Sequence, residues 1–169
     1  MFLQIFIAIP LVLLSIGCNS PNDLAPKKVD LHAILPRELL DFNGSLVSRE
    51  TLQGKHLGLY FSASWCPPCR TFTPKLIKFR NERLMDFEVI LVGMDRSRED
   101  QRAYVDDYDM PWPSLPHESE SLAKLKALFG IKSIPTLIIL SPDGVVISTR
   151  GREEISTKGS AAFDGWLVR

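Results

Sequence analysis

The feature that most restricts the fold is a pair of cysteines that stands between an apolar run and a helical pattern. The segment SASWCPPCR contains Cys66 and Cys69, two of the three cysteines in the 169-residue chain. The preceding residues 56–63 (HLGLYFSA) form a continuous apolar and aromatic run, typical of a buried strand. Residues 67–84 then place apolar side chains at helical intervals behind two prolines, at the position where a missing N–H costs least. A second apolar run, 87–94, predicts the next strand, so the cysteines lie in a strand–loop–helix–strand unit.

The remainder of the chain continues the alternation of helices and strands. Residues 97–108 are polar and predict a helix, and 119–130 predict a second one, with a serine at its start and a glycine at its end. Two apolar runs, 136–140 and 145–150, flank the turn SPDG and predict a hairpin. Residues 160–168 can supply a closing helix. We therefore expect one α/β domain, a mixed sheet with helices on both faces.

The position of the two cysteines indicates their chemistry. At a helix N-terminus, unpaired backbone N–H groups and the helix dipole stabilise a thiolate. The thiolate is the nucleophile in disulfide exchange. Cys66 comes first and is expected to be the more exposed, so it should attack a substrate disulfide, and Cys69 should resolve the mixed disulfide. This predicts dithiol redox chemistry, with no cofactor beyond the Cys66–Cys69 disulfide.

Three other interpretations compete with redox exchange. A structural disulfide more often bridges distant elements, because a ring of four residues constrains the unfolded chain little. Half of a zinc site would need two more ligands, but His32, His56 and His117 have no paired spacing, so we expect no metal. A peroxidase nucleophile would use a hydroxyl three residues before Cys66, where this chain has Ala63. A C-x-x-C motif beside a strand–helix pattern is the signature of redox exchange, which we prefer.

The motifs around the cysteines resemble those of the thioredoxin superfamily. These motifs are WCPPCR, Pro74 five residues after the second cysteine, and SIPTLIIL about 65 residues further on. The stretch YFSASWCPPCRTFTPKL, the segment MPWPSLP, and RGREEI followed by Trp166 are most similar to the tryparedoxin and nucleoredoxin branch. The resemblance covers residues 42–166 and implies a thioredoxin fold.

The resemblance also implies roles for individual residues. Cys66 is then the attacking thiol and Cys69 the resolving thiol, with Pro135 as a cis-proline that faces them. Ile134 would offer its backbone to an extended substrate segment. Independently, X-Pro bonds are the ones that adopt the cis form at low cost, and a proline at the start of an apolar strand needs an explanation. An edge-strand proline is the alternative.

Aromatic and proline side chains complete the expected substrate-binding surface. Trp65, immediately before the cysteines, is expected to form an apolar rim on which a partner docks, together with Pro67 and Pro68. The resemblance places Trp112 near the same face. Either tryptophan could instead be packed inside the domain.

Two positions depart from the pattern of the family. Many thioredoxins have a buried aspartate six residues before the attacking cysteine, where it helps to move a proton. This chain has Tyr60 there, so the proton acceptor for Cys69 is unassigned. An aromatic residue usually follows the MPW-x-x-x-P pattern of the branch, whereas this chain has His117.

The residues between the cysteines bear on the direction of electron flow. Strong oxidants and isomerases of this superfamily typically have a histidine there, which adds a donor beside the thiolate. Pro67 and Pro68 supply neither a side-chain charge nor an N–H, and this favours a disulfide reductase. The alternatives are a disulfide oxidase or isomerase, and a binding adaptor without turnover. An intact cysteine pair argues against the adaptor.

The first 17 residues are almost wholly apolar and end in small residues, as expected of a secretory signal peptide. The segment LLSIGC resembles the lipobox of bacterial lipoproteins, in which the cysteine, here Cys18, receives lipid. Ser15 departs from that pattern, and no Lys or Arg precedes the apolar run. Ordinary cleavage and an uncleaved anchor are the alternatives. We expect a signal peptide at 1–17, a flexible tether at 18–34 and the thioredoxin-like domain at 35–169, exported to the cell envelope or periplasm.

The overall charge excludes one class of partner. Twenty basic residues balance twenty acidic ones, so no net field attracts nucleic acid. The partners we expect are protein disulfides, an upstream electron donor of the membrane or thioredoxin type, and the membrane itself through the N-terminal lipid or anchor. We expect the chain to be a monomer.

Overall fold

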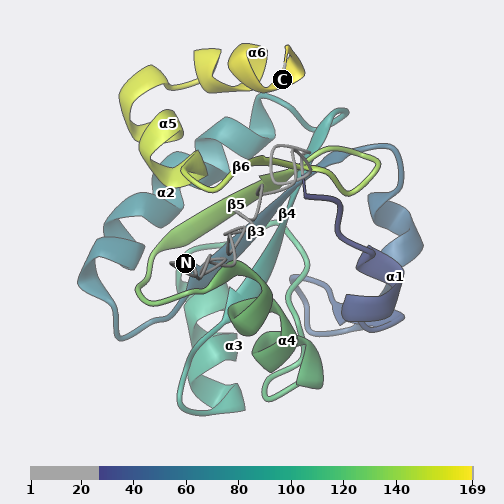
Figure 1. The fold of residues 1–169 in the computed structure, drawn as a ribbon. Coiled ribbons are helices and arrows are strands. Elements are labelled where there is room, and N and C mark those ends of the chain that lie inside the picture. Colours follow the sequence, from purple (N-terminus) through teal and green to yellow (C-terminus); the bar gives the residue numbers. More distant parts are fainter. Residues whose placement is uncertain (1–26, 169) are drawn as a thin grey trace, which may run out of the picture.

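The computed structural model describes residues 27–168, so the predicted signal peptide and Cys18 lie outside the described residues. Strands and helices alternate along the chain (Figure 1). The elements in order are α1 (Leu31–Ile34), β1 (Glu38–Leu40), β2 (Leu46–Ser48), the 3-10 helix η2 (Arg49–Leu52), β3 (His56–Ser62), α2 (Pro67–Asn81), β4 (Phe87–Gly93), α3 (Arg98–Asp107), α4 (Glu120–Phe129), β5 (Thr136–Leu140), β6 (Val146–Ser148), α5 (Gly151–Lys158) and α6 (Ala161–Leu167).

The central sheet has four strands in the order β4-β3-β5-β6. Strand β3 pairs parallel with β4 and antiparallel with β5. The parallel pair requires a crossover, which α2 supplies, because parallel strands cannot be joined by a tight turn. Strands β5 and β6 form the predicted hairpin, in which Gly144 adopts φ 80° and donates its N–H to the carbonyl oxygen of Ser141. The predicted mixed sheet is confirmed.

Helices cover both faces of this sheet, which explains why its inner strands are continuous apolar runs. Figure 1 shows α2, α5 and α6 on one side of the strands and α1 and α4 on the other. The cluster on the first side includes Tyr60, Phe79 and Phe87, and the second includes Leu59, Ile90 and Leu125. Every residue of β4 is buried. The predicted two-faced α/β architecture is therefore correct.

One charged residue, Glu88, lies within the buried strand β4. A buried carboxylate is tolerated only when it is paired and hydrogen-bonded. Arg80 of α2 provides this partner: its Nε donates to Oε1 of Glu88 at 2.8 Å and its Nη2 donates to Oε2 at 2.6 Å. The ion pair ties α2 to the edge strand of the sheet.

Helix α5 and the β1–β2 hairpin were not anticipated from the sequence. Helix α5 buries only Gly151 and Ile155, too few apolar positions to produce a helical periodicity. Gly151 is needed for close packing, since a Cβ there would lie 2.8 Å from Ile139. Tertiary contacts with the sheet therefore stabilise α5.

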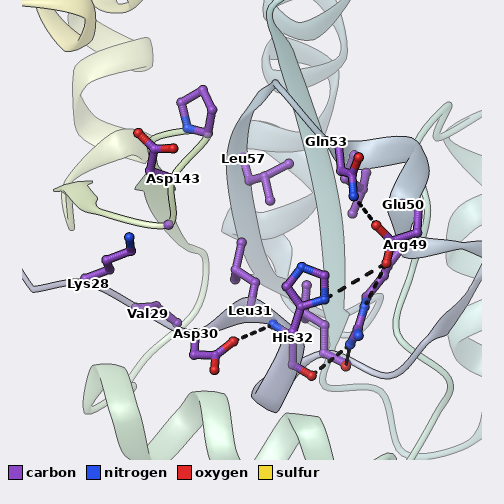
Figure 2. A pocket seen from close by; sticks show the side chains of 14 residues that line it. Lys28, Val29, Asp30, Leu31, His32, Arg49, Glu50, Gln53, Leu57 and Asp143 are labelled. Atoms are coloured by element: carbon purple, nitrogen blue, oxygen red, sulfur yellow. Dashed lines mark hydrogen bonds and ion pairs between the residues drawn. The ribbon is translucent and has the colours of Figure 1, made fainter.

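Residues 27–34, which the sequence assigned to a flexible tether, contact the domain. Val29 is buried and its N–H donates to the carbonyl oxygen of Gly144. Figure 2 shows how Arg49 holds this segment: its Nη1 donates to the carbonyl oxygens of His32 at 2.9 Å and Leu35 at 2.6 Å. The packed part of the chain thus begins ahead of the predicted boundary at 35.

Candidate active site

The two cysteines lie where β3 ends and α2 begins. Cys66 is the N-cap of α2, and Pro67 and Pro68 occupy its first two positions, as predicted. The two sulfurs form a disulfide. The backbone N–H of Cys69 points at Sγ of Cys66, 3.3 Å away. Cys66 is 4% exposed and lines a surface pocket, whereas Cys69 is fully buried and does not, so Cys66 is the cysteine of the pair that faces a partner.

The loop before β5 faces Cys66 from across the site. The Ile134–Pro135 peptide bond is cis, as the family resemblance implied. The carbonyl oxygen of Ile134 lies 3.7 Å from Sγ of Cys66, and Pro135 is buried. The structure thus brings together two segments that are separated by 68 residues in the sequence.

A groove runs between these two segments. Four of the predicted substrate-binding residues line it: Trp65, Pro67, Pro68 and Ile134. Trp65 is 50% exposed, and its Nε1 donates to the carbonyl oxygen of Met94 at 3.1 Å, which holds the indole at the rim. The complete lining is Trp65, Cys66, Pro67, Pro68, Met94, Lys126, Ile131, Lys132, Ser133 and Ile134.

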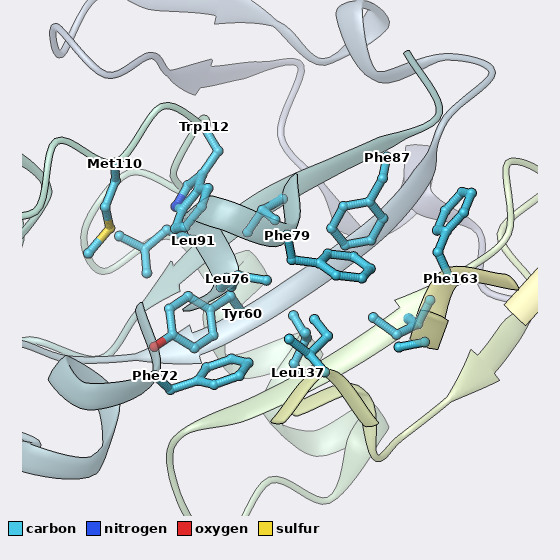
Figure 3. Packing of buried hydrophobic residues seen from close by; sticks show 14 of the residues in the cluster. Tyr60, Phe72, Leu76, Phe79, Phe87, Leu91, Met110, Trp112, Leu137 and Phe163 are labelled. Atoms are coloured by element: carbon cyan, nitrogen blue, oxygen red, sulfur yellow. The ribbon is translucent and has the colours of Figure 1, made fainter. Parts of the chain in front are cut away.

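Trp112, by contrast, does not lie on the groove. It is 1% exposed and packs perpendicular to the ring of Tyr60, with the ring centroids 6.4 Å apart (Figure 3). The backbone explains this position. Leu91 of β4 accepts the N–H of Leu115 and donates to the carbonyl oxygen of Pro113, so the segment runs along the sheet and Trp112 enters the core. The prediction that Trp112 contacts substrate is therefore not supported: this tryptophan is a core residue.

Tyr60 occupies the place of the family's buried aspartate, directly behind Cys69. Its hydroxyl donates to the carbonyl oxygen of Cys69 at 3.2 Å and lies 2.9 Å from Oγ1 of Thr73. Burial destabilises the phenolate and raises the pKa of Tyr60 far above its usual range near 10. The phenol stays protonated at neutral pH, so Tyr60 is a hydrogen-bond donor and cannot accept the proton of Cys69.

The hydroxyl of Tyr60 is the first of four that form a buried chain. Oγ1 of Thr73 lies 2.7 Å from the hydroxyl of Tyr104, which in turn lies 2.9 Å from Oγ of Ser62. Thr73 also donates to the carbonyl oxygen of Cys69 at 3.0 Å. The chain joins the first turns of α2 to β3 and α3. No single residue in the sequence signals it, because its members come from three elements.

Asp95 is another residue of the site that the sequence analysis did not identify. It is buried, and its Oδ1 accepts the N–H of Ser64 at 2.7 Å, so it holds the loop that leads to Cys66. Nε2 of His117 lies 3.1 Å from the carbonyl oxygen of Asp95, so the backbone of Asp95 has a side-chain contact of its own. A signal existed: β3 and β4 are adjacent and parallel, so the residues after β4 must lie beside the cysteine loop after β3.

Residues 27–168 contain neither a metal-binding cluster nor a membrane-spanning helix. In that part of the chain, no three His, Cys, Asp or Glu side chains gather closely enough to hold a metal ion. None of the helices described there has the length and apolar character that crossing a membrane requires.

Sequence comparison agrees with this geometry. Residues 54–146 match the family described as Thioredoxin-like. Nucleoredoxin of Mus musculus is 42% identical over 126 residues, which cover 72% of this chain and 28% of the relative. Probable nucleoredoxin 3 of Oryza sativa subsp. japonica is 46% identical over 116 residues, 66% of this chain and 24% of the relative. The chain thus spans about a quarter of the length of these curated relatives.

Solved structures match over almost their whole length. Tryparedoxin from Trypanosoma brucei has a TM-score of 0.72 and 38% identity, with 80% of this chain and 96% of that chain covered. Tryparedoxin II complexed with glutathionylspermidine has a TM-score of 0.70 and 36% identity, with 78% and 94% covered. The architecture is the thioredoxin fold. With a sequence match over more than half of its length, this chain belongs to the thioredoxin-like family of thiol-disulfide oxidoreductases.

Proposed function

We propose that this protein reduces protein disulfides outside the cytoplasm by exchange through Cys66 and Cys69. The observation that carries the proposal is the asymmetry of the pair. Cys66 lines the groove beside Ile134, whereas Cys69 is bonded to it from the enclosed side. A structural disulfide would need neither the groove nor the asymmetry.

The reaction starts from the dithiol. The thiolate of Cys66 attacks one sulfur of a substrate disulfide, and the other substrate sulfur leaves as a thiolate that takes up a proton. Cys69 then loses its proton and attacks Sγ of Cys66, which releases the second substrate thiol. Two electrons have moved to the substrate, and the Cys66–Cys69 disulfide is the oxidised product. An upstream dithiol donor must reduce it before the next turnover.

The groove supports this chemistry by holding the substrate. The carbonyl oxygen of Ile134, next to the sulfur of Cys66, can accept a backbone N–H from an extended segment. Trp65 offers half of its surface as an apolar contact. Neither interaction by itself depends on the side chains of the bound segment.

The reduction potential tests the proposed direction of electron flow. When the full chain is equilibrated with glutathione, we expect the Cys66–Cys69 couple to lie below about −200 mV, near thioredoxin at about −270 mV. The reason is that Pro67 and Pro68 provide no charge and no N–H to stabilise the thiolate. The Pro68→His variant is the matched comparison and should be more oxidising. A wild-type potential near −120 mV would contradict the reductase assignment and favour an oxidase.

We also propose that the chain is exported and attached to the membrane by lipid on Cys18. The apolar leader and the sequence LLSIGC support this proposal. The nine peptide units that join Cys18 to Lys27 span at most about 32 Å when fully extended. A lipid at Cys18 would therefore keep the active site near the membrane, within reach of a membrane electron donor.

Membrane fractionation tests the lipid attachment. Cys18→Ala should move the protein from the membrane to the soluble fraction of the envelope, or block processing of the leader. A variant with unchanged membrane association and unchanged mobility on a gel would contradict lipid attachment and favour an uncleaved anchor.

A further inference from the structure

The groove beside Cys66 carries an uneven distribution of charge. Two of its ten lining residues are cations, Lys126 in the last turn of α4 and Lys132 in the loop that leads to β5. None of the ten is an acidic residue. The chain as a whole has zero formal net charge, so this positive patch is a local property of the active face.

Neither lysine has a structural task among the described residues. No ion pair in residues 27–168 includes Lys126 or Lys132, whereas the neighbouring Lys124 pairs with Glu120 at 3.1 Å. Three carbonyl oxygens at the end of α4 already accept hydrogen bonds from other groups: that of Ala127 from the N–H of Gly130, that of Lys126 from the N–H of Ile131, and that of Leu128 from Nζ of Lys27. The two ammonium groups are therefore available to a bound partner.

The rest of the groove strengthens their effect. Apolar side chains such as Trp65, Met94 and Ile131 line the same surface. A charge beside apolar walls is less screened than one surrounded by water, so a concave site with one sign of charge attracts the opposite sign. A segment that reaches Cys66 in this groove enters the same pocket that Lys126 and Lys132 line.

We propose that the groove selects extended protein segments that carry Asp or Glu within a few residues of the reacting cysteine, with Lys126 and Lys132 as the residues that determine this specificity. The inference rests on the proposed exchange function and adds a substrate class to it. Segments with Lys or Arg in the same positions are disfavoured, because like charges repel across the interface.

The test uses two peptides that differ only in charge. Each contains a cysteine in a disulfide with the same small thiol, flanked by two Glu residues in one peptide and by two Lys residues in the other. The full chain, recycled by a dithiol, is expected to reduce the Glu peptide with a kcat/KM about five- to tenfold higher at low ionic strength. The preference should shrink towards one at about 1 M salt, where the screening length falls to about 3 Å.

Charge reversal identifies the residues responsible. The double variant Lys126→Glu, Lys132→Glu should invert the preference, so that the Lys peptide becomes the better substrate. The decisive measurement is the ratio of kcat/KM for the Glu peptide to kcat/KM for the Lys peptide. Loss of positive charge near Cys66 also changes the reactivity of its thiol, but this change affects both peptides equally and cancels in the ratio. Lys124→Glu is the matched control, on the same helix but outside the groove, and should keep the wild-type ratio.

The outcomes separate the two proposals. If the wild-type protein reduces both peptides at equal rates, or if the double variant keeps the wild-type ratio, the specificity is wrong and the exchange function stands. If Lys124→Glu shifts the ratio as much as the double variant, the preference arises from overall charge and not from the groove. If the wild-type protein reduces neither peptide, the exchange function fails, and the inference fails with it.

Discussion

The Cys66→Ser variant is expected to lose disulfide reductase activity by a factor of at least about 10³, because the attacking nucleophile is removed and such losses reach about 10⁶ in other enzymes. A serine hydroxyl is not ionised at neutral pH and cannot form the sulfur–sulfur bond of the mixed disulfide. Of the two described cysteines only Cys66 lines the groove, so the enclosed Cys69 is not expected to take over the attack on substrate. Reduction of insulin disulfides in the presence of a dithiol measures the loss.

The Cys69→Ser variant is the matched comparison. It keeps the attacking thiol and loses the resolving one, so it should stall as a mixed disulfide that appears as a mass shift on a non-reducing gel. In the native cell the same trap would capture the physiological substrates. If Cys69→Ser kept full turnover while Cys66→Ser formed the stable mixed disulfide, the two roles would have to be exchanged.

The two tryptophans are expected to respond to mutation in opposite ways. Trp112→Ala should lower the free energy of unfolding by about 3–5 kcal/mol, because it leaves a large cavity in the core beside Tyr60. Trp65→Ala should change this free energy by less than about 1 kcal/mol, since half of the side chain is exposed, and should instead lower kcat/KM for protein disulfides. Chemical denaturation and the insulin assay measure the two effects.

A conservative substitution controls the first of these effects. The indole Nε1 of Trp112 has no hydrogen-bond partner among the described residues, so Trp112→Phe removes volume but no hydrogen bond and should cost clearly less than Trp112→Ala. The opposite pattern, a stable Trp112→Ala variant with impaired kcat/KM, would restore the assignment of Trp112 to the substrate-binding surface.

Local patterns were sufficient for the elements that carry the reacting groups. Strands β3 and β4 were predictable because a strand covered on both faces must be apolar throughout. The start of α2 was predictable from Pro67 and Pro68, since proline is favoured at the first positions of a helix, where its missing N–H breaks no hydrogen bond. For the same reason, the sequence alone placed Cys66 at a helix N-terminus and indicated its chemistry.

The tertiary structure decided which distant residues meet at that helix. Trp65 and Trp112 both lie near prolines, and nothing in their local sequence shows that Trp65 is exposed at the rim and Trp112 is buried in the core. The hydrogen bonds of Pro113 and Leu115 with Leu91 decide this, because they direct Trp112 into the core. The alignment of β4 beside β3 likewise brings Asp95 under the cysteine loop.

The remaining site features also depend on packing between segments far apart in the chain. The cis Ile134–Pro135 loop faces Cys66 across 68 residues of sequence, and it brings Lys132 to the groove with it. The sequence by itself determined the reacting pair and the strands and helix around it, because those depend on interactions between near neighbours in the chain. The surface that a substrate meets was decided only by the tertiary structure, because its residues are joined by packing and by pairing between strands, which leave no periodic pattern in the sequence.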